Sequence, residues 1–430
     1  MPSVCSPPPH RWLPLFVVLL GLSLSATADE SQPDWLLITT PQLAEVAAPL
    51  IQRRADQGFA VSVIDVSTLP AEDNGPDICA AIHSTRQATN CCVLILGTWE
   101  STDSAVHVPA MRGTHGRMKG RLTDHAYGLP EQDGGVSVAV GRLPARSTDE
   151  AKSMVTRILA FEDQQPKQNR IQVSVGHPGG RSEFERNFAA GVIRSAVDLR
   201  LKRIAALWTT TCIMDLDDSP YSVTAGQFGE KMRELMRQEH LFSVYSGHSS
   251  PAAVYSRNGP VVKRSDFGSL NATGPAGVFL SCGCYSCQVE GFNGQGYGIA
   301  SIRNPTGPVA VMGAFGESWA AHGQLAFDGA LSCLAQKNPP RRLGDYWLAV
   351  QRGIARGQIT QAEFLLYDMA DGSNGQVPLD QQRLEHAEMW TLLGDPAMRI
   401  PLATTKTPAT SKGETEDAAN SADATPVRDR

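Results

Sequence analysis

Short apolar runs alternate with segments of helical periodicity through the first part of the chain. Mostly apolar runs predict strands at 35–38, 60–66, 92–97 and 136–140. After the first run, Thr40 and Pro41 are typical of a helix N-terminus. Apolar residues follow at helical spacing from Leu43 to Ile51, and Gly58 ends the predicted helix. Ser147 and Glu150 have the spacing of a capping box ahead of another amphipathic helix. Strands that are apolar on both faces and alternate with helices predict a mostly parallel sheet covered on both sides.

A second series of the same kind begins after a polar linker at 164–169. Its predicted strands are 171–175, 203–208, 241–245, 276–280 and 308–312. From 317 to 391 the pattern is mainly helical, and a short strand is predicted at 398–402. The expected fold class is therefore α/β, with two three-layer subdomains side by side over residues 32–165 and 166–403.

The two ends of the chain differ in composition from the rest. Arg11 precedes an apolar stretch from Leu13 to Leu24, which ends in the small residues Ala26-Thr-Ala28. This is the layout of a secretory signal peptide over residues 1–28, and the stretch is shorter than the roughly 20 residues that span a bilayer. An uncleaved signal anchor is the alternative. We expect an exported, soluble mature protein and a disordered tail at 404–430, where almost no apolar side chains occur.

Composition excludes some classes of function. The formal net charge is −6 over 430 residues, which argues against the basic face of a nucleic-acid binder and against attraction to anionic lipid. Eight cysteines remain after the signal peptide, an even number that permits disulfides in an oxidising compartment but does not specify their pairing.

Two predicted strands end in residues that can support covalent catalysis. The strand at 241–245 leads to Gly247-His248-Ser249, and the strand near 276–280 leads to Cys282-Gly-Cys284-Tyr-Ser-Cys287. A cysteine and a histidine at neighbouring strand ends can form a thiolate pair, with backbone N–H groups available for an oxyanion. Two other interpretations stay open: a zinc site made by Cys282, Cys284, Cys287 and His248, or structural residues including a disulfide.

Five segments, in order and over about residues 34–403, resemble the gingipain-type cysteine peptidases of the caspase–hemoglobinase fold group. They are Val138-Ala-Val-Gly-Arg-Leu-Pro144, Tyr245-Ser-Gly-His-Ser249, Gly277-Val-Phe-Leu-Ser-Cys-Gly-Cys284, Thr306 to Trp319 and Leu392-Leu-Gly-Asp-Pro-Ala-Met-Arg399. The resemblance implies a cysteine endopeptidase acting on protein or peptide substrates, with no required cofactor. It places the nucleophile at Cys284 and not at Cys282, and the general acid and base at His248.

The resemblance also implies roles for further residues. An acidic residue of the first subdomain near the histidine corresponds to Asp124. Ser249 replaces a glycine and contributes an oxyanion N–H. For cleavage after basic residues, the pocket carboxylate corresponds to Asp133 and the pocket wall to Trp319.

Family members often carry structural calcium, for which the acidic turn at 215–218 offers oxygen ligands. Because Cys282 and Cys287 flank the nucleophile and Ser249 departs from the motif, an inactive binding or assembly module is the alternative function.

Overall fold

The computed structural model describes residues 32–69, 75–99, 101–178, 183–217, 219–274, 276–291 and 294–403. The predicted signal peptide and tail therefore lie outside the described residues. The strands are β1 Asp34–Thr39, β2 Ala60–Asp65, β3 Cys91–Leu96, β4 Met111–Arg112, β5 Leu122–Thr123, β6 Ala139–Leu143, β7 Asn169–Val175, β8 Trp208–Met214, β9 Phe242–Ser246, β10 Ser249–Ser250, β11 Ala253–Ser256, β12 Gly259–Lys263, β13 Ala276–Ser281, β14 Pro308–Ala314 and β15 Trp390–Leu393. The helices are α1 Pro41–Asp56, α2 Gly75–Thr85, α3 Thr148–Glu162, α4 Glu183–Leu201, α5 Ala225–Arg237, α6 Arg264–Gly268, α7 Tyr297–Arg303, α8 Ala320–Leu334, α9 Leu343–Arg356, α10 Gln361–Asp371 and α11 Leu379–Met389.

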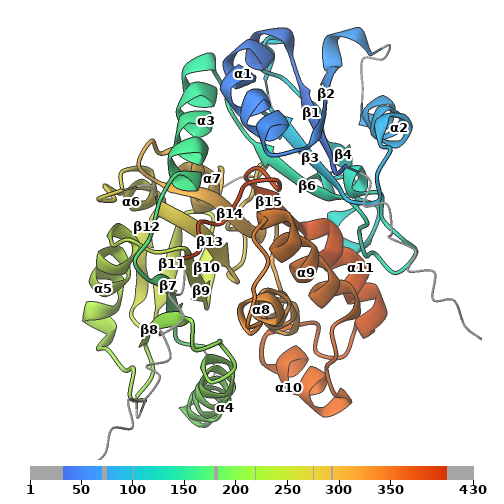
Figure 1. The fold of residues 1–430 in the computed structure, drawn as a ribbon. Helices are drawn as coiled ribbons and strands as arrows, with labels where there is room; N and C mark the ends of the chain where they lie inside the picture. The colour runs from blue at the N-terminus through green and yellow to red at the C-terminus, as the bar shows by residue number, and fades with distance from the viewer. Residues whose placement is uncertain are drawn as a thin grey trace, which may run out of the picture.

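The two predicted halves share one continuous sheet of ten strands, in the order β2-β1-β3-β6-β15-β14-β13-β9-β7-β8 (Figure 1). The α/β class and the mostly parallel sheet are thus confirmed. β15 joins the halves, because it pairs in parallel with β6 and antiparallel with β14. The parallel strands of the first half therefore run antiparallel to those of the second half. As a result, the C-terminal ends of β9 and β13 lie at the same edge of the sheet as the N-terminal end of β6.

Helices cover both faces of the first half, as the alternation of its side chains requires. Trp35 and Leu37 of β1 pack with Leu43 of α1 and Met154 of α3 in one core cluster. Leu36 and Ile38 point to the opposite face and pack with Ile78 and Ile82 of α2 in a second cluster.

The second half is covered on both faces in the same way. Phe242 of β9 contacts Tyr346 of α9, with the ring centroids 4.9 Å apart. Phe279 of β13 lies on the opposite face, where it stacks with Phe267 of α6 at 5.9 Å and contacts Tyr297 of α7.

The aspartate of the closing Gly-Asp-Pro segment has a structural role. Asp395 accepts hydrogen bonds from Nη2 of Arg54 at 2.7 Å and from Nε1 of Trp35 at 3.1 Å. Arg54 is fully buried and also binds Glu162 at 2.8 Å, so its charge is compensated by two carboxylates. This network connects the segment that follows β15 to α1, α3 and β1.

Three predicted strands are shifted. β6 begins at Ala139, three residues after the expected start, because Val136 bridges Pro130 in a turn. β8 covers Trp208–Met214 and not 203–208; it is an edge strand with a run of exposed threonines, which an apolar pattern does not detect. The last strand is β15 and not 398–402, where Arg399 makes only an isolated bridge to Arg342. Within the described residues, no helix combines the length and the apolar character required to cross a bilayer.

Candidate active site

His248 and Cys284 leave neighbouring strands at equivalent positions. β9 and β13 are parallel neighbours, and Tyr245 is in register with Ser281. His248 and Cys284 each follow their member of this pair by three residues. The sheet therefore brings the two predicted residues to one place at its carboxyl edge, where ligands bind in open α/β sheets.

The imidazole of His248 is anchored by a backbone carbonyl. Its Nε2 lies 2.6 Å from the carbonyl oxygen of Pro178, which follows β7. A carbonyl can only accept, so Nε2 carries the proton. The other nitrogen, Nδ1, lies 3.9 Å from Oδ2 of Asp371, and the side chain is 40% exposed. One ring nitrogen is thus fixed as a donor, and Nδ1 is left to exchange protons.

The main chain around His248 is also held. The Tyr245 hydroxyl donates to the carbonyl of His248 at 2.6 Å. Burial raises the pKa of Tyr245 well above its ordinary value, so the hydroxyl stays a donor. Gly247 has a φ of 154°, and a Cβ there would lie 2.9 Å from the Tyr245 hydroxyl and 3.0 Å from the Cα of Gly176. Only glycine fits this turn.

The thiol of Cys284 is partly buried and protonated in the resting site. Its Sγ donates to the carbonyl of Ser318 at 3.3 Å. Burial, followed by the negative charge of Asp371, raises the pKa of Cys284 to about 12. Tyr285, the next residue, has a φ of 58°, a conformation that is strained for a side chain of this size. The nucleophile candidate therefore lies at a sharp, strained turn.

Ser249 connects the two strand ends. Its hydroxyl donates to the carbonyl of Cys284 at 2.7 Å. The hydroxyl of Tyr297 donates to Oγ of Ser249 at 3.3 Å and lies 2.6 Å from Oγ of Ser281. The serine that replaces a glycine in the motif thus turns its side chain toward the Cys284 backbone and fixes the distance between the two loops.

Ser318 and Trp319 form the next layer of the site. Oγ of Ser318 accepts from Nε1 of Trp390 at 3.2 Å, and the backbone N–H of Trp319 donates to Nε2 of His386 at 3.1 Å. Because Ser318 also accepts from Cys284, residues of β15 and α11 hold the segment that contacts the thiol.

An arginine of the first half covers Trp319. The guanidinium carbon of Arg117 lies 3.9 Å from the centroid of the Trp319 ring. Nε of Arg117 donates to Glu385 at 2.6 Å, and Nη1 donates to Glu317 at 2.9 Å. Arg117 lies in the crossover before β6, which the opposite strand directions bring to this edge. The predicted pocket wall therefore lies beside the thiol segment, in contact with the protein's own guanidinium.

The carboxylate of Asp124 is bound by Arg142 and Trp99. Its two carboxylate oxygens each accept from Arg142 at 2.7 Å, and one also accepts from Nε1 of Trp99 at 3.2 Å. Arg142 belongs to the Val-Gly-Arg segment of β6 and is fully buried. The carboxylate found near His248 is Asp371, at the end of α10.

Asp133 forms an ion pair at the surface. Its carboxylate binds Arg356 and accepts from the backbone N–H of Gly135 at 3.0 Å, with 47% of the side chain exposed. The Arg356 hydrogen bond lowers the pKa of Asp133 to about 2. Glu131 binds the same arginine at 2.6 Å. The structure places Asp133 in this ion-pair cluster.

The cysteines are separate thiols and form no metal cluster in the described part of the chain. All eight described cysteines are free, and no group of three or more His, Cys, Asp or Glu side chains is placed to hold a metal. Burial raises the pKa of Cys282 and of Cys287 to about 12. The proposed zinc set, Cys282, Cys284, Cys287 and His248, is not assembled.

The acidic turn predicted to bind calcium is held by an arginine. Asp215 accepts from Nε of Arg257 at 2.9 Å, and Asp217 accepts from Nη1 of the same residue at 2.7 Å. Asp218 lies outside the described residues. Calcium binding stays a prediction.

Sequence reasoning missed two residues that contact the histidine. Pro178 acts through its carbonyl, which no side-chain pattern reveals; the only available signal was the sequence Gly-His-Pro-Gly-Gly directly after β7. Asp371 ends α10, 87 positions after Cys284, in an Asp-Gly pair that is common at helix ends.

The sequence profile of peptidase family C25 matches residues 28–401 of the chain. The fold is similar to that of the Arg-specific cysteine proteinase gingipain R (RgpB), with 15% identity, a TM-score of 0.62, and coverage of 87% of this chain and 80% of that one. It is also similar to the complex of the pro- and mature domains of Porphyromonas gingivalis RgpB, with 15% identity, a TM-score of 0.61, and coverage of 86% and 80%. No curated protein sequence matched the chain.

Proposed function

The chain belongs to peptidase family C25 and is a cysteine-type peptidase, and on this premise we propose that Cys284 is its nucleophile and His248 its general acid and base. The hydrogen bond between His248 and Pro178 carries this proposal. It fixes the proton on Nε2 and leaves Nδ1 as the nitrogen that can accept the thiol proton.

The proposed reaction proceeds through a thioester. Nδ1 of His248 takes the thiol proton, and the thiolate of Cys284 attacks the carbonyl carbon of the peptide. The C–N bond breaks as the imidazolium returns the proton to the leaving amine. Water then hydrolyses the thioester, which releases the carboxylic acid and restores the thiol. We assign the oxyanion contacts to the backbone N–H groups of Cys284 and Ser249.

The high pKa of Cys284 bears on how the thiolate forms. A thiol with a pKa of about 12 is protonated at neutral pH, so proton transfer to His248 must accompany attack or substrate binding. The negative charge of Asp371 disfavours the thiolate. A cationic substrate group near Asp371 would offset this effect.

We also propose a preference for basic residues next to the cleaved bond. Asp371 and Glu317 both raise the pKa of Cys284, so both carboxylates act on the thiol. The chain's own Arg117 shows that the Trp319 ring and Glu317 together accommodate a guanidinium. Because Asp371 and Glu317 both act on the thiol of Cys284, we take these two, and not Asp133, as the specificity carboxylates.

Export is the proposed location. It rests on the apolar segment Leu13–Leu24, its preceding Arg11 and the small residues that end at Ala28. Detection of a mature N-terminus near residue 29 in the exported fraction would support it.

The decisive experiment is cleavage of a peptide library by the wild type and by Cys284→Ala, with Cys282→Ala as the matched control. Both cysteines are partly buried, and both follow β13. We expect Cys284→Ala to abolish cleavage and Cys282→Ala to keep most of it. Loss with Cys282→Ala and retention with Cys284→Ala would refute the assignment. A folded wild type without any cleavage would favour the inactive module.

A further inference from the structure

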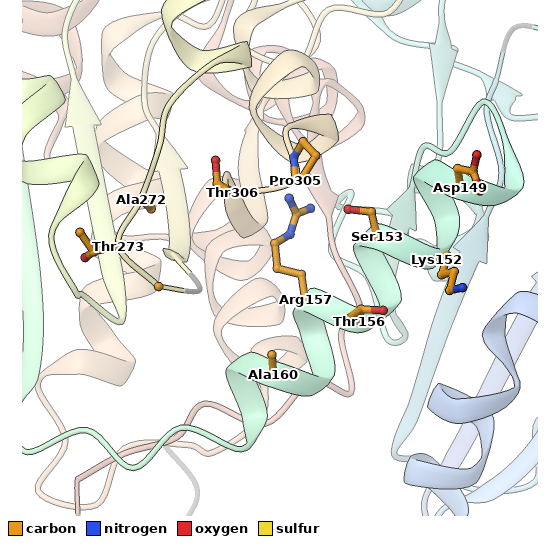
Figure 2. A pocket seen from close by; sticks show the side chains of 11 residues that line it. Asp149, Lys152, Ser153, Thr156, Arg157, Ala160, Ala272, Thr273, Pro305 and Thr306 are labelled. Carbon is orange, nitrogen blue, oxygen red and sulfur yellow. The ribbon is translucent and has the colours of Figure 1, made fainter.

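A cavity of about 510 Å³ lies at the seam between the two halves of the molecule, distinct from the Cys–His site. It opens between helix α3 and the loops that follow α6 and α7 (Figure 2). Its polar lining consists of Asp149, Lys152, Ser153, Thr156, Arg157, Thr273 and Thr306. The volume is in the range of ligand pockets.

Arg157 is a buried cation without a carboxylate partner at this cavity. It is 6% exposed. Its Nη2 donates to the carbonyl of Ile302 at 2.5 Å, and its Nη1 donates to the carbonyl of Asn304, both at the end of α7. Nε is buried and has no hydrogen-bond partner among the described residues. Two backbone carbonyls therefore bind this guanidinium, whereas a buried arginine is usually paired with a carboxylate.

Other buried arginines of the chain show the usual arrangement. Arg54 is bound by two carboxylates and Arg142 by the carboxylate of Asp124. Arg157 differs from both. Burial lowers its pKa to about 10, so the guanidinium is still charged at neutral pH. A buried charge left without a counter-charge is destabilising, and a bound anion would compensate it.

The surroundings of Arg157 suit a polar anion. Lys152, Ser153 and Thr156 line the cavity together with Arg157. Ser153 lies four residues before Arg157, and Lys152 lies four residues before Thr156, so each pair is adjacent on the surface of α3. Figure 2 shows the guanidinium reaching from α3 toward Pro305, with the Ser153 hydroxyl on the same side. The lining holds two cations and one acidic residue, Asp149, so it carries a net positive charge.

We propose that this cavity binds a small organic anion with a carboxylate or phosphate group, which Arg157 pairs with and which Lys152 and the α3 hydroxyls help to hold. The ligand would contact α3 of the first half and the loops of the second half. Binding would therefore stabilise the seam between them. This inference is independent of the proposed peptidase mechanism.

The test is thermal unfolding with inorganic phosphate and, separately, with succinate, each against sodium chloride at the same ionic strength. We expect a saturable rise of Tm by a few degrees with at least one of the two anions, and the one that acts identifies the head group. The absence of a rise with both anions would overturn the proposal.

Arg157→Met and Arg383→Met make a matched pair of variants. Arg383 also donates to the carbonyls at a helix end, Ala355 at 2.7 Å and Gly357 at 2.6 Å, and burial also lowers its pKa. It lies outside the lining of this cavity. Both variants should lose stability, but only Arg157→Met should lose the response to the anion.

Lys152→Ala keeps the test decisive if Arg157→Met does not fold. Lys152 is exposed, so its removal should preserve the fold and raise the anion concentration at half-response about tenfold. Lys167→Ala, an exposed lysine of the linker, is its charge-matched control. An unchanged response in Lys152→Ala, or the same response in Arg157→Met as in the wild type, would overturn the proposal.

Discussion

His248 and Pro178 are joined by a 2.6 Å hydrogen bond in which the imidazole Nε2–H donates to the backbone carbonyl. The bond spans 70 positions of sequence and connects the ends of β7 and β9, which are neighbours in the sheet. A main-chain carbonyl therefore selects the tautomer of the proposed base, a role that many catalytic sites give to a carboxylate.

His248→Ala should slow alkylation of Cys284. Without Nδ1 to accept the proton, the thiol keeps a high pKa and reacts slowly with iodoacetamide at neutral pH. We expect the rate to fall at least tenfold, as followed by mass spectrometry of the Cys284 peptide. His240→Gln, a change at a buried histidine away from the site, is the control. Equal rates in wild type and His248→Ala would exclude the pair.

Asp371→Asn should move the pH profile of Cys284 alkylation to lower pH. The carboxylate of Asp371 is the charge that, after burial, most raises the pKa of Cys284. Removing it should lower the apparent pKa of the thiol by on the order of one unit. Asp380→Asn makes the same charge change at an exposed position of α11. A profile that does not move would show that Asp371 does not act on the thiol.

Glu317→Gln should weaken a preference for arginine next to the cleaved bond. Loss of one charge-assisted hydrogen bond costs roughly 1.5–3 kcal/mol, about ten- to a hundredfold in kcat/KM for arginine relative to leucine substrates. Asp133→Ala should leave this ratio within about twofold, because Arg356 binds that carboxylate. If Asp133→Ala abolishes the preference and Glu317→Gln does not, the pocket is built on Asp133.

Stability should fall as the pH drops below about 6.5. Burial lowers the pKa of His125 and of His240 to about 4, and that of His322 to about 3. Between these values and the unfolded value near 6.5, the unfolded chain binds more protons than the native protein. Acid therefore favours unfolding, by up to about 1.4 kcal/mol per pH unit for each histidine.

Urea unfolding of wild type and His240→Gln at pH 7 and pH 5 measures this effect. The loss of unfolding free energy between the two values should be smaller in the variant, since one depressed group has been removed. His83→Gln, at an exposed histidine, is the control and should keep the wild-type dependence. Identical pH dependence in wild type and His240→Gln would contradict the prediction.

The sequence pointed to the two proposed catalytic side chains because they follow strands whose apolar runs are unmistakable. His248 and Cys284 each stand just beyond such a run, and parallel strands bring their ends together. The roles of Asp124 and Asp133, which were assigned by position along the chain, stay predictions. In the structure their carboxylates form ion pairs with Arg142 and Arg356.

The rest of the site could not be read from one-dimensional patterns. The contact of Arg117 with Trp319 depends on the two halves of the sheet running in opposite directions, which follows from the pairing of β15. β15 itself was missed because its four residues continue from α11 without a turn signal.

The placement of β15 has a consequence for biosynthesis. β6 and β14 are fully buried strands, and each leaves one edge uncovered until residues 390–393 have emerged from the ribosome. Until then the nascent chain carries two apolar sheets with bare edges, the kind of surface that pairs with other chains. A product that stops before Trp390 would keep both edges, and we expect it to aggregate or be degraded even though His248 and Cys284 have already been synthesised.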